Sequence, residues 1–247
     1  MTLTALKSAP APSLEIFDAE RFCRAWLTIS VAMSDNPDGP GYRQMLVERY
    51  DTGFQLLSNC GYLMLRAFVP DESSEEIKHR WPDVDELPSE SFIVSDSDKR
   101  ADALLKYALK TMKPADAPAQ SISVRLGQLP AEPGQFDAMA SRAFEIEFPA
   151  GKTISESVSL HVIEGEPMGW RELVASSSDS DPIEGIRLSP TLVLKRLASL
   201  ATYWPMASVD LEFRGRNSAF RIEVPIDFCG VRVSGVAMPQ YVSEEDA

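Results

Sequence analysis

The sequence predicts an α+β fold made of repeated units, each a helix followed by an antiparallel meander of strands. Two observations support this: apolar residues recur at helical spacing in three segments, and each such segment precedes a stretch in which apolar and polar residues alternate. The helices are expected at residues 18–33, 98–113 and 190–203, and the strand groups at residues 43–69, 121–163 and 208–238. One such unit cannot bury its apolar face alone, so the copies must share a core or close into a larger array.

The first unit begins with a predicted strand at residues 13–17, and Asp18 is placed to cap the helix that follows. Residues 35–41 are so rich in Pro, Gly, Asp and Asn that neither a helix nor a central strand can cross them. The meander after this stop has tight turns near residues 51–53 and 58–61. The apolar positions of the helix mostly keep helical spacing, and they are Phe22, Ala25, Trp26, Ile29 and Val31.

The second unit follows an acidic, proline-rich connector at residues 71–90 and begins with a strand that contains Phe92. Asp96, Ser97 and Asp98 are candidates for capping its helix. Alternation of apolar and polar residues then predicts half-buried strands at residues 121–126, 143–148 and 157–163.

The third unit follows a Ser/Asp-rich hinge at residues 176–182, and Ser189 with Pro190 opens its helix. Its strands are expected at residues 209–213, 220–224 and 231–236. The predicted organisation is a flexible arm at 1–13, a domain of two units at 14–175, a third unit or partial domain at 176–242, and an acidic tail at 243–247.

Composition restricts the classes of function. The chain has 247 residues, of which 44% are hydrophobic, so it is long enough to bury a core. A formal net charge of −13 excludes binding to nucleic acid or anionic membrane through the average charge, so a DNA-facing role requires segregated Lys and Arg. Three cysteines without paired spacing, Cys23, Cys60 and Cys229, indicate buried, reduced thiols. No apolar run is long enough to span a membrane and no signal-peptide pattern is present, so we expect a soluble, cytoplasmic protein.

No sequence motif indicates catalysis. The two histidines, His79 and His161, lie in the acidic connector and in a predicted strand, without a plausible Cys partner, so we expect one on the surface and one packed in the sheet. The segment Asp179-Ser-Asp lacks the Gly and Glu positions of a calcium loop and is interpreted as a linker. Dinucleotide, P-loop and hydrolase motifs do not occur. We therefore expect no enzyme activity, metal or cofactor.

Four segments resemble the bacterial-type sliding clamp, the ring-shaped processivity factor of replicative DNA polymerases. Residues 52–65 are similar to a strand pair of the clamp, with one extra residue in the turn. Residues 162–174 are similar to its interdomain connector, without the aromatic residue that precedes Pro167. Residues 188–197 resemble the entry to its last helix, and residues 230–239 resemble its closing strand and Met-Pro ending. Together the matches cover most of the chain and imply a clamp-type fold.

The number of helix-plus-meander units predicted here differs from that in the clamp family. A clamp domain pairs two helix-plus-meander units, whereas three are predicted here, as if one whole domain were followed by the second half of another. A ring of the family's size would then need four chains, or the chain would close in a different way.

The resemblance implies that basic residues on the helices hold duplex DNA through its phosphates, without reading bases, so that the protein can slide. The alternative, from the charge pattern alone, is that these residues are ordinary solvated faces of amphipathic helices. The residues concerned are Arg21, Arg24, Lys99, Arg100, Lys106, Lys110, Lys113, Lys195 and Arg196.

The resemblance also implies an apolar pocket that binds a short peptide from a polymerase or another partner. Its walls would be Gly61, Tyr62, Leu63, Val236, Ala237, Met238 and Pro239. The alternative is that Leu63 and Val236 are strand core and that Met238 and Pro239 merely end a strand.

Three functional hypotheses follow. The first is a diverged, phage-like sliding clamp that forms a homo-oligomer, encircles or tethers to duplex DNA, and binds a DNA polymerase without catalysing a reaction. The second is a clamp-fold interaction module that does not close a ring and binds or sequesters replication proteins. The third is an acidic, β-rich structural or virion protein, which predicts neither DNA retention nor peptide binding.

Overall fold

The computed structural model of the chain describes residues 13–16, 19–37, 42–70, 82, 85–112, 122–128, 142–149, 155–163, 169–176, 188–203, 208–213, 219–224 and 232–239. Several predicted features lie wholly or mostly outside these residues. They are the arm at 1–13, the connector at 71–90, the hinge at 176–182, the tail at 243–247, and Asp18, His79, Lys113, Asp179 and Cys229.

The described residues form an α+β fold with one sheet of eleven strands, in which neighbouring strands are antiparallel. The predicted fold class is therefore confirmed. The strands are β1 Ser13–Ile16, β2 Gln44–Tyr50, β3 Gly53–Asn59, β4 Leu63–Pro70, β5 Glu90–Ser95, β6 Ile122–Gln128, β7 Arg142–Pro149, β8 Ser155–Ile163, β9 Asp210–Glu212, β10 Phe220–Val224 and β11 Arg232–Ala237. The helices are α1 Ala19–Ser30, α2 Arg100–Thr111, α3 Trp170–Ser176 and α4 Lys195–Ser199, with a π-helical turn Pro190–Leu194 before α4 and a 3-10 turn Leu200–Thr202 after it.

The strand order shows how the three units meet. It runs β1-β6-β7-β8-β5-β2-β3-β4-β11-β10-β9. The first two units exchange their leading strands, because β1 pairs with β6 of the second unit and β5 pairs with β2 of the first. The third unit is joined to the first one, through the pairing of β4 with β11. Its position in space is therefore beside the first unit, although it follows the second in the sequence.

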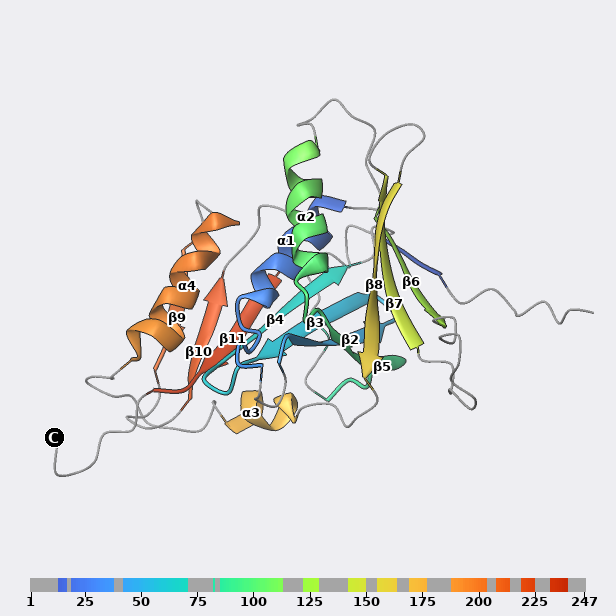
Figure 1. The fold of residues 1–247 in the computed structure, drawn as a ribbon. Coiled ribbons are helices and arrows are strands. Elements are labelled where there is room, and N and C mark those ends of the chain that lie inside the picture. The colour runs from blue at the N-terminus through green and yellow to red at the C-terminus, as the bar shows by residue number, and fades with distance from the viewer. Residues whose placement is uncertain are drawn as a thin grey trace, which may run out of the picture.

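The sheet carries α1, α2 and α4 on one face and α3 on the other (Figure 1). Alternating residues of β4 explain this division, since side chains of a strand point to opposite faces in turn. Leu63, Leu65 and Ala67 belong to the large core beneath the helices, whereas Met64 belongs to a second apolar cluster with Trp170 of α3. Strands β3 and β4 are accordingly buried along almost their whole length.

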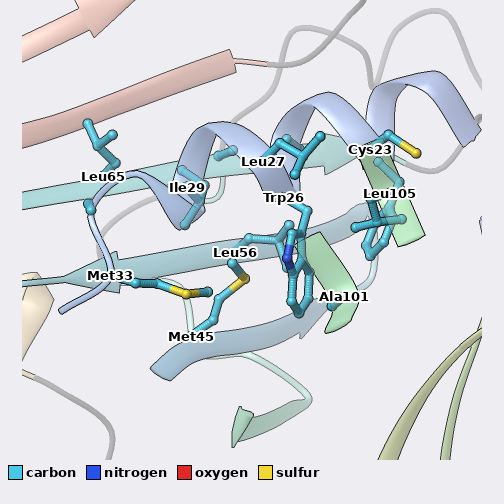
Figure 2. Packing of buried hydrophobic residues seen from close by; sticks show 14 of the residues in the cluster. Cys23, Trp26, Leu27, Ile29, Met33, Met45, Leu56, Leu65, Ala101 and Leu105 are labelled. Carbon is cyan, nitrogen blue, oxygen red and sulfur yellow. The ribbon is translucent and has the colours of Figure 1, made fainter. Parts of the chain in front are cut away.

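Helix α1 is the centre of the large core. Four of its predicted apolar positions, Phe22, Ala25, Trp26 and Ile29, are buried, while Val31 lies just beyond the helix and is partly buried. Figure 2 shows the Trp26 ring pointing from α1 into the space between the sheet and α2. The ring stacks on Phe144 at 6.2 Å, so one indole links the first and second units.

Lys99 occupies the N-cap position of α2, and Asp96, one of the three capping candidates, bonds the first turn of the helix from three residues earlier in the chain. The Asp96 carboxylate accepts hydrogen bonds from the backbone N–H of Ala101, at 3.0 Å, and of Asp102, at 3.3 Å. The buried Arg43 guanidinium bonds the carboxylate of Asp102 at 2.6 Å. Burial raises the pKa of Asp96, since a desolvated carboxylate is less stable when charged.

The structure differs from the sequence-based expectations in three details. The third helix is predicted as one element but is divided into π, α and 3-10 turns, with the Ser189 hydroxyl accepting from Leu192 N–H at 3.2 Å. Helix α3 is absent from the predicted elements. The side chain of His161 is exposed rather than packed, because it falls on the outward side of β8.

Cys23 is buried and Cys60 is partly buried, and both are thiols. Among the described residues, no helix is long and apolar enough to cross a membrane. The same part of the chain brings together no three potential metal-ligating side chains.

Candidate functional site

The two segments of the predicted peptide pocket are neighbours in the structure. Strand β4 pairs with β11 in the register Leu63↔Ala237 and Met64↔Val236. Beyond the strands, the backbone N–H of Met238 donates to the carbonyl of Tyr62 at 2.8 Å. We call this junction of the first and third units, from residues 61–68 and 232–239, the seam.

A glycine allows the strands of the seam to approach. A Cβ atom on Gly235 would lie 2.1 Å from the carbonyl oxygen of Met64, a distance that no side chain tolerates. Gly61, in the turn before β4, has a φ of +89° and an exposed position. Its N–H donates to the Asn59 side chain at 2.6 Å, which fixes the conformation of the turn between β3 and β4.

The seven predicted pocket residues fall into two groups. Gly61, Tyr62 and Met238 are exposed and Pro239 is partly so, with 52% of Tyr62 and 39% of Met238 accessible. Leu63, Val236 and Ala237 are buried. We call Tyr62 and Met238 the rim, since they are large apolar side chains left uncovered at the end of the seam.

The outer face of the seam is already filled by Trp170 from α3. This side chain is fully buried and packs in the second apolar cluster. Leu46, Leu57 and Met64 come from the first unit, and Ala219 and Val236 come from the third. One indole ring therefore spans both units on the outer face, next to the predicted pocket.

A buried carboxylate anchors the polar side of the same ring. Glu48 of β2 is 1% exposed and accepts four hydrogen bonds. Its donors are Tyr50 Oη at 2.9 Å, Gln55 Nε2 at 2.8 Å, Trp170 Nε1 at 3.3 Å and Arg171 Nη1 at 3.1 Å. Burial beside this carboxylate raises the pKa of Tyr50 far above its usual value. Glu48 was not among the predicted site residues, although an acid inside the apolar run Met45-Leu-Val-Glu-Arg-Tyr50 is a signal that could have found it.

Arg171 completes this cluster. Its second guanidinium nitrogen donates to Tyr50 Oη at 2.9 Å, and its guanidinium carbon lies 4.4 Å from the centre of the Trp170 ring. Arg66 of β4 approaches the same ring at 5.3 Å. The indole thus has two guanidinium groups within cation–π distance and a carboxylate at its N–H.

Two of the predicted DNA-facing residues bond to backbone carbonyls beyond a neighbouring helix. Arg24 of α1 donates to the carbonyl of Tyr203 beyond α4 and pairs with Glu20 at 2.7 Å. Arg196 of α4 donates to the carbonyls of Val31 and, at 3.0 Å, Met33 beyond α1. Each helix therefore supplies an arginine to the C-terminal end of the other, where the helix dipole favours a cation.

Asp35 reduces the net charge of this helix face. Its carboxylate lies 3.4 Å from Arg196, 3.8 Å from Lys99 and 3.8 Å from Arg43. Asp35 lies in the loop that follows α1. Two of the three cations, Arg196 and Lys99, are predicted DNA-facing residues.

Four of the other predicted cations are exposed to solvent. Arg100, Lys106 and Lys110 of α2 and Lys195 of α4 have exposed side chains, and in the described part of the chain none of them makes an ion pair. Arg21 is partly buried on α1. The structure thus concentrates exposed positive charge on α2. Beside α2 lies a shallow cavity of about 340 Å³ that is lined by Arg100, Tyr107 and Glu156, among others.

No protein-family model matches the sequence, and no curated protein matches it. Solved structures do match the fold. The DNA polymerase III beta subunit from Thermotoga maritima has a TM-score of 0.55 at 12% identity, over 98% of this chain and 68% of that chain. The fold is that of the DNA sliding clamps.

Two further clamps agree with this assignment of the fold. The beta subunit from Pseudomonas aeruginosa has a TM-score of 0.55 at 12% identity, over 98% of this chain and 69% of that one. The beta subunit from Borrelia burgdorferi, in complex with a natural product, gives 0.52 at 9% identity, over 97% and 65%. The chain spans about two thirds of the length of these clamps, and 53% of a putative beta subunit from Eubacterium rectale, whose TM-score is 0.44. The clamp fold expected from the sequence is therefore confirmed.

Proposed function

We propose that this protein is a sliding-clamp-like processivity factor, which holds duplex DNA without reading its sequence and binds peptides of a DNA polymerase or other partners at the seam. The observation that carries the proposal is the seam itself. Residues 61–63 and 236–239, which the sequence places far apart, are adjacent within a clamp fold and leave Tyr62 and Met238 uncovered. An exposed apolar pair at the edge of a buried cluster is suited to receive the anchor side chains of a peptide.

The proposed DNA contact rests on the arrangement of charge. Three cations of α2, Arg100, Lys106 and Lys110, are exposed although the chain as a whole carries a net charge of −13. Lysines and arginines on one helix face bind phosphates irrespective of base sequence, and such contacts permit movement along the duplex. We propose no catalytic group, metal or cofactor for this function.

The topology of the DNA tests the proposal. A protein that encircles or tethers to DNA is expected to remain on a nicked circular plasmid during gel filtration and to leave it once the plasmid is cut to a linear form. Equal retention on circular and linear DNA would contradict the proposed clamp function, because a protein bound only through phosphates does not distinguish the two.

A second function is favoured by one specific observation. The edge of β4, at which the third unit docks, is already occupied within the chain by β11. An interaction module that does not close a ring, and that binds or sequesters replication proteins through the seam, agrees with this arrangement. It predicts peptide binding by a persistent monomer, without topology-dependent retention on DNA.

A further inference from the structure

Two consecutive side chains of α3, Trp170 and Arg171, cover the outer face of the seam. Trp170 fills the apolar cluster, and the next residue, Arg171, reaches the buried Glu48. We propose that this cluster is a binding site for partner segments in which an aromatic residue is followed by Arg or Lys, and that α3 is its internal occupant. This inference rests on the proposed binding of partner peptides at the seam and names the class of peptide.

The chemistry of Glu48 specifies the ligand. In the described part of the chain, Arg171 is the one cation that pairs with this carboxylate, at 3.1 Å, and Glu48 is 1% exposed. A buried carboxylate without its cation carries an uncompensated charge. Any segment that replaces α3 must therefore bring a cation to the same place, and an aliphatic or acidic peptide does not meet this requirement.

The shape of the apolar cluster specifies the residue before the cation. Leu46, Leu57, Met64 and Val236 come from the neighbouring strands β2, β3, β4 and β11, and the indole ring that packs with them has none of its surface exposed. The carboxylate of Glu48 also accepts from the indole N–H at 3.3 Å. An aromatic ring, preferably with a polar edge, is thus the side chain that fits.

The site continues onto an exposed surface that α3 does not cover. Tyr62 and Met238 of the rim lie at the end of the same strand pair that carries Met64 and Val236, and the Met238 N–H donates to the Tyr62 carbonyl at 2.8 Å. A partner segment that fills the cluster and also covers the rim gains apolar contact that α3 lacks. This extra contact adds to the affinity that the aromatic and cationic side chains provide.

Helix α3 is too short to be stable by itself. It has seven residues, and a helix of this length is not stable without tertiary contacts. Glu172 is exposed, and Leu173 and Val174 are only partly buried. Trp170 is therefore the one fully buried anchor among the described side chains of α3, and Leu173 and Val174 pack more loosely against the same cluster.

The experiment uses the full chain and a synthetic peptide with the sequence of residues 169–176, Gly-Trp-Arg-Glu-Leu-Val-Ala-Ser. The double variant Trp170→Ala, Arg171→Ala empties the site, and we expect it to bind the peptide about ten-fold more tightly than the wild type does, or better. A peptide with Ala in place of Trp is expected not to bind. Glu172→Gln, on the exposed side of α3, is the matched control and should bind as the wild type does.

A second measurement tests whether α3 leaves the site when the peptide binds or stays in place as a fixed part of it. Hydrogen exchange of the α3 amides in the wild-type protein should become faster when the peptide is present at saturation, because the peptide displaces α3. Unchanged exchange, or no binding of the peptide by the folded double variant, would overturn the proposal. If the double variant does not fold, Trp170→Phe replaces it, with the same expectation at a smaller fold-change. Retention on circular DNA is measured independently, so a protein that binds the peptide but is indifferent to topology contradicts the clamp function and not this site.

Discussion

Single residues on the outer face of the sheet determine whether α3 stays attached. Glu48 is desolvated and is tolerated because four donors surround it. Three of these donors are neutral, so among the described residues Arg171 alone compensates the charge. The Arg171 side chain is 27% exposed, which means that water screens part of its attraction to Glu48.

Arg171→Ala is therefore expected to lower the free energy of unfolding by about 2 kcal/mol, less than the loss for a fully buried pair because of the screening by solvent. Urea denaturation measures the change. Glu172→Gln on the same helix is the control and should stay within about 0.5 kcal/mol of the wild type. A decrease for Arg171→Ala no larger than that of the control would show that the pair with Glu48 contributes nothing to stability.

Tyr50 makes stability depend on alkaline pH. Its pKa is raised in the folded protein, chiefly because the phenol is buried and then because Glu48 lies beside it. In the unfolded chain the pKa of this phenol returns to about 10. Above that pH the unfolded state loses a proton that the folded state keeps, so stability is complete below about pH 10 and falls as the pH rises further.

Tyr50→Phe removes this titration. The variant should be less stable than the wild type at neutral pH, since Glu48 and Arg171 each lose a hydrogen bond, but the free energy of unfolding should decline less steeply above about pH 10. Denaturant titrations on both sides of that pH provide the comparison. Identical slopes for the two proteins would mean that Tyr50 ionises normally in the fold.

At the scale of the elements, the sequence predicts best where one periodic pattern decides the structure. Helices α1 and α2 are predicted because each has one apolar face, and their observed bounds lie within the predicted ranges. Helix α3 is missed because seven residues contain too few turns to show a period, and because its formation depends on the contact of Trp170 with strands from two units.

The candidate site shows the same limit. The resemblance to clamps selects residues 61–63 and 236–239, and the structure brings them together, but no local pattern indicates that Trp170 and Arg171 fill the adjacent cluster. Similarly, charge at helical spacing finds Arg24 and Arg196 without revealing that backbone carbonyls of a neighbouring helix bind them. Both omissions concern contacts between residues that are distant in the sequence.

The seam depends on one close approach between β4 and β11. Gly235→Ala would place a methyl group 2.1 Å from the carbonyl oxygen of Met64, so the strands must separate locally. We expect a decrease of about 1–3 kcal/mol in stability, typical of overpacking, and an increase in the solvent exposure of Trp170. Tryptophan fluorescence quenching, compared with that of a variant in which Trp170 is substituted, identifies the contribution of this indole. An unchanged protein would mean that the seam is looser than the distance indicates.

Helix α2 carries the proposed contact with DNA. Lys106→Glu combined with Lys110→Glu should weaken binding to duplex DNA and reduce the slope of log affinity against log salt by roughly 0.9 for each phosphate that the variant no longer neutralises. Molar mass and unfolding should not change, because both side chains are exposed and make no ion pair within the described residues. If affinity and slope are unaffected, DNA does not bind to this face of α2.

At the scale of the whole molecule, the edges of β8 and β4 differ in whether another strand pairs with them. Strand β8 is the last strand of the second unit, as β4 and β11 are of the first and third. The edge of β4 is covered by β11, whereas residues 155–160 of β8, within the described part of the chain, pair only with β7. An uncovered edge is a template for another strand.

We therefore expect further copies of the chain to associate through β8 and the adjacent surface of α2, where Tyr107 is 42% exposed. Light scattering should then give a molar mass that is a multiple of 27.3 kDa. Tyr107→Asp should shift the mass towards one chain, because it buries a charge at the contact, whereas Leu194→Asp, at a similarly exposed residue on the π-helical turn before α4, should not. A wild-type protein that remains at 27.3 kDa under all concentrations would exclude a ring and favour the interaction module, since one chain with its β4 edge already occupied has no second seam with which to encircle DNA.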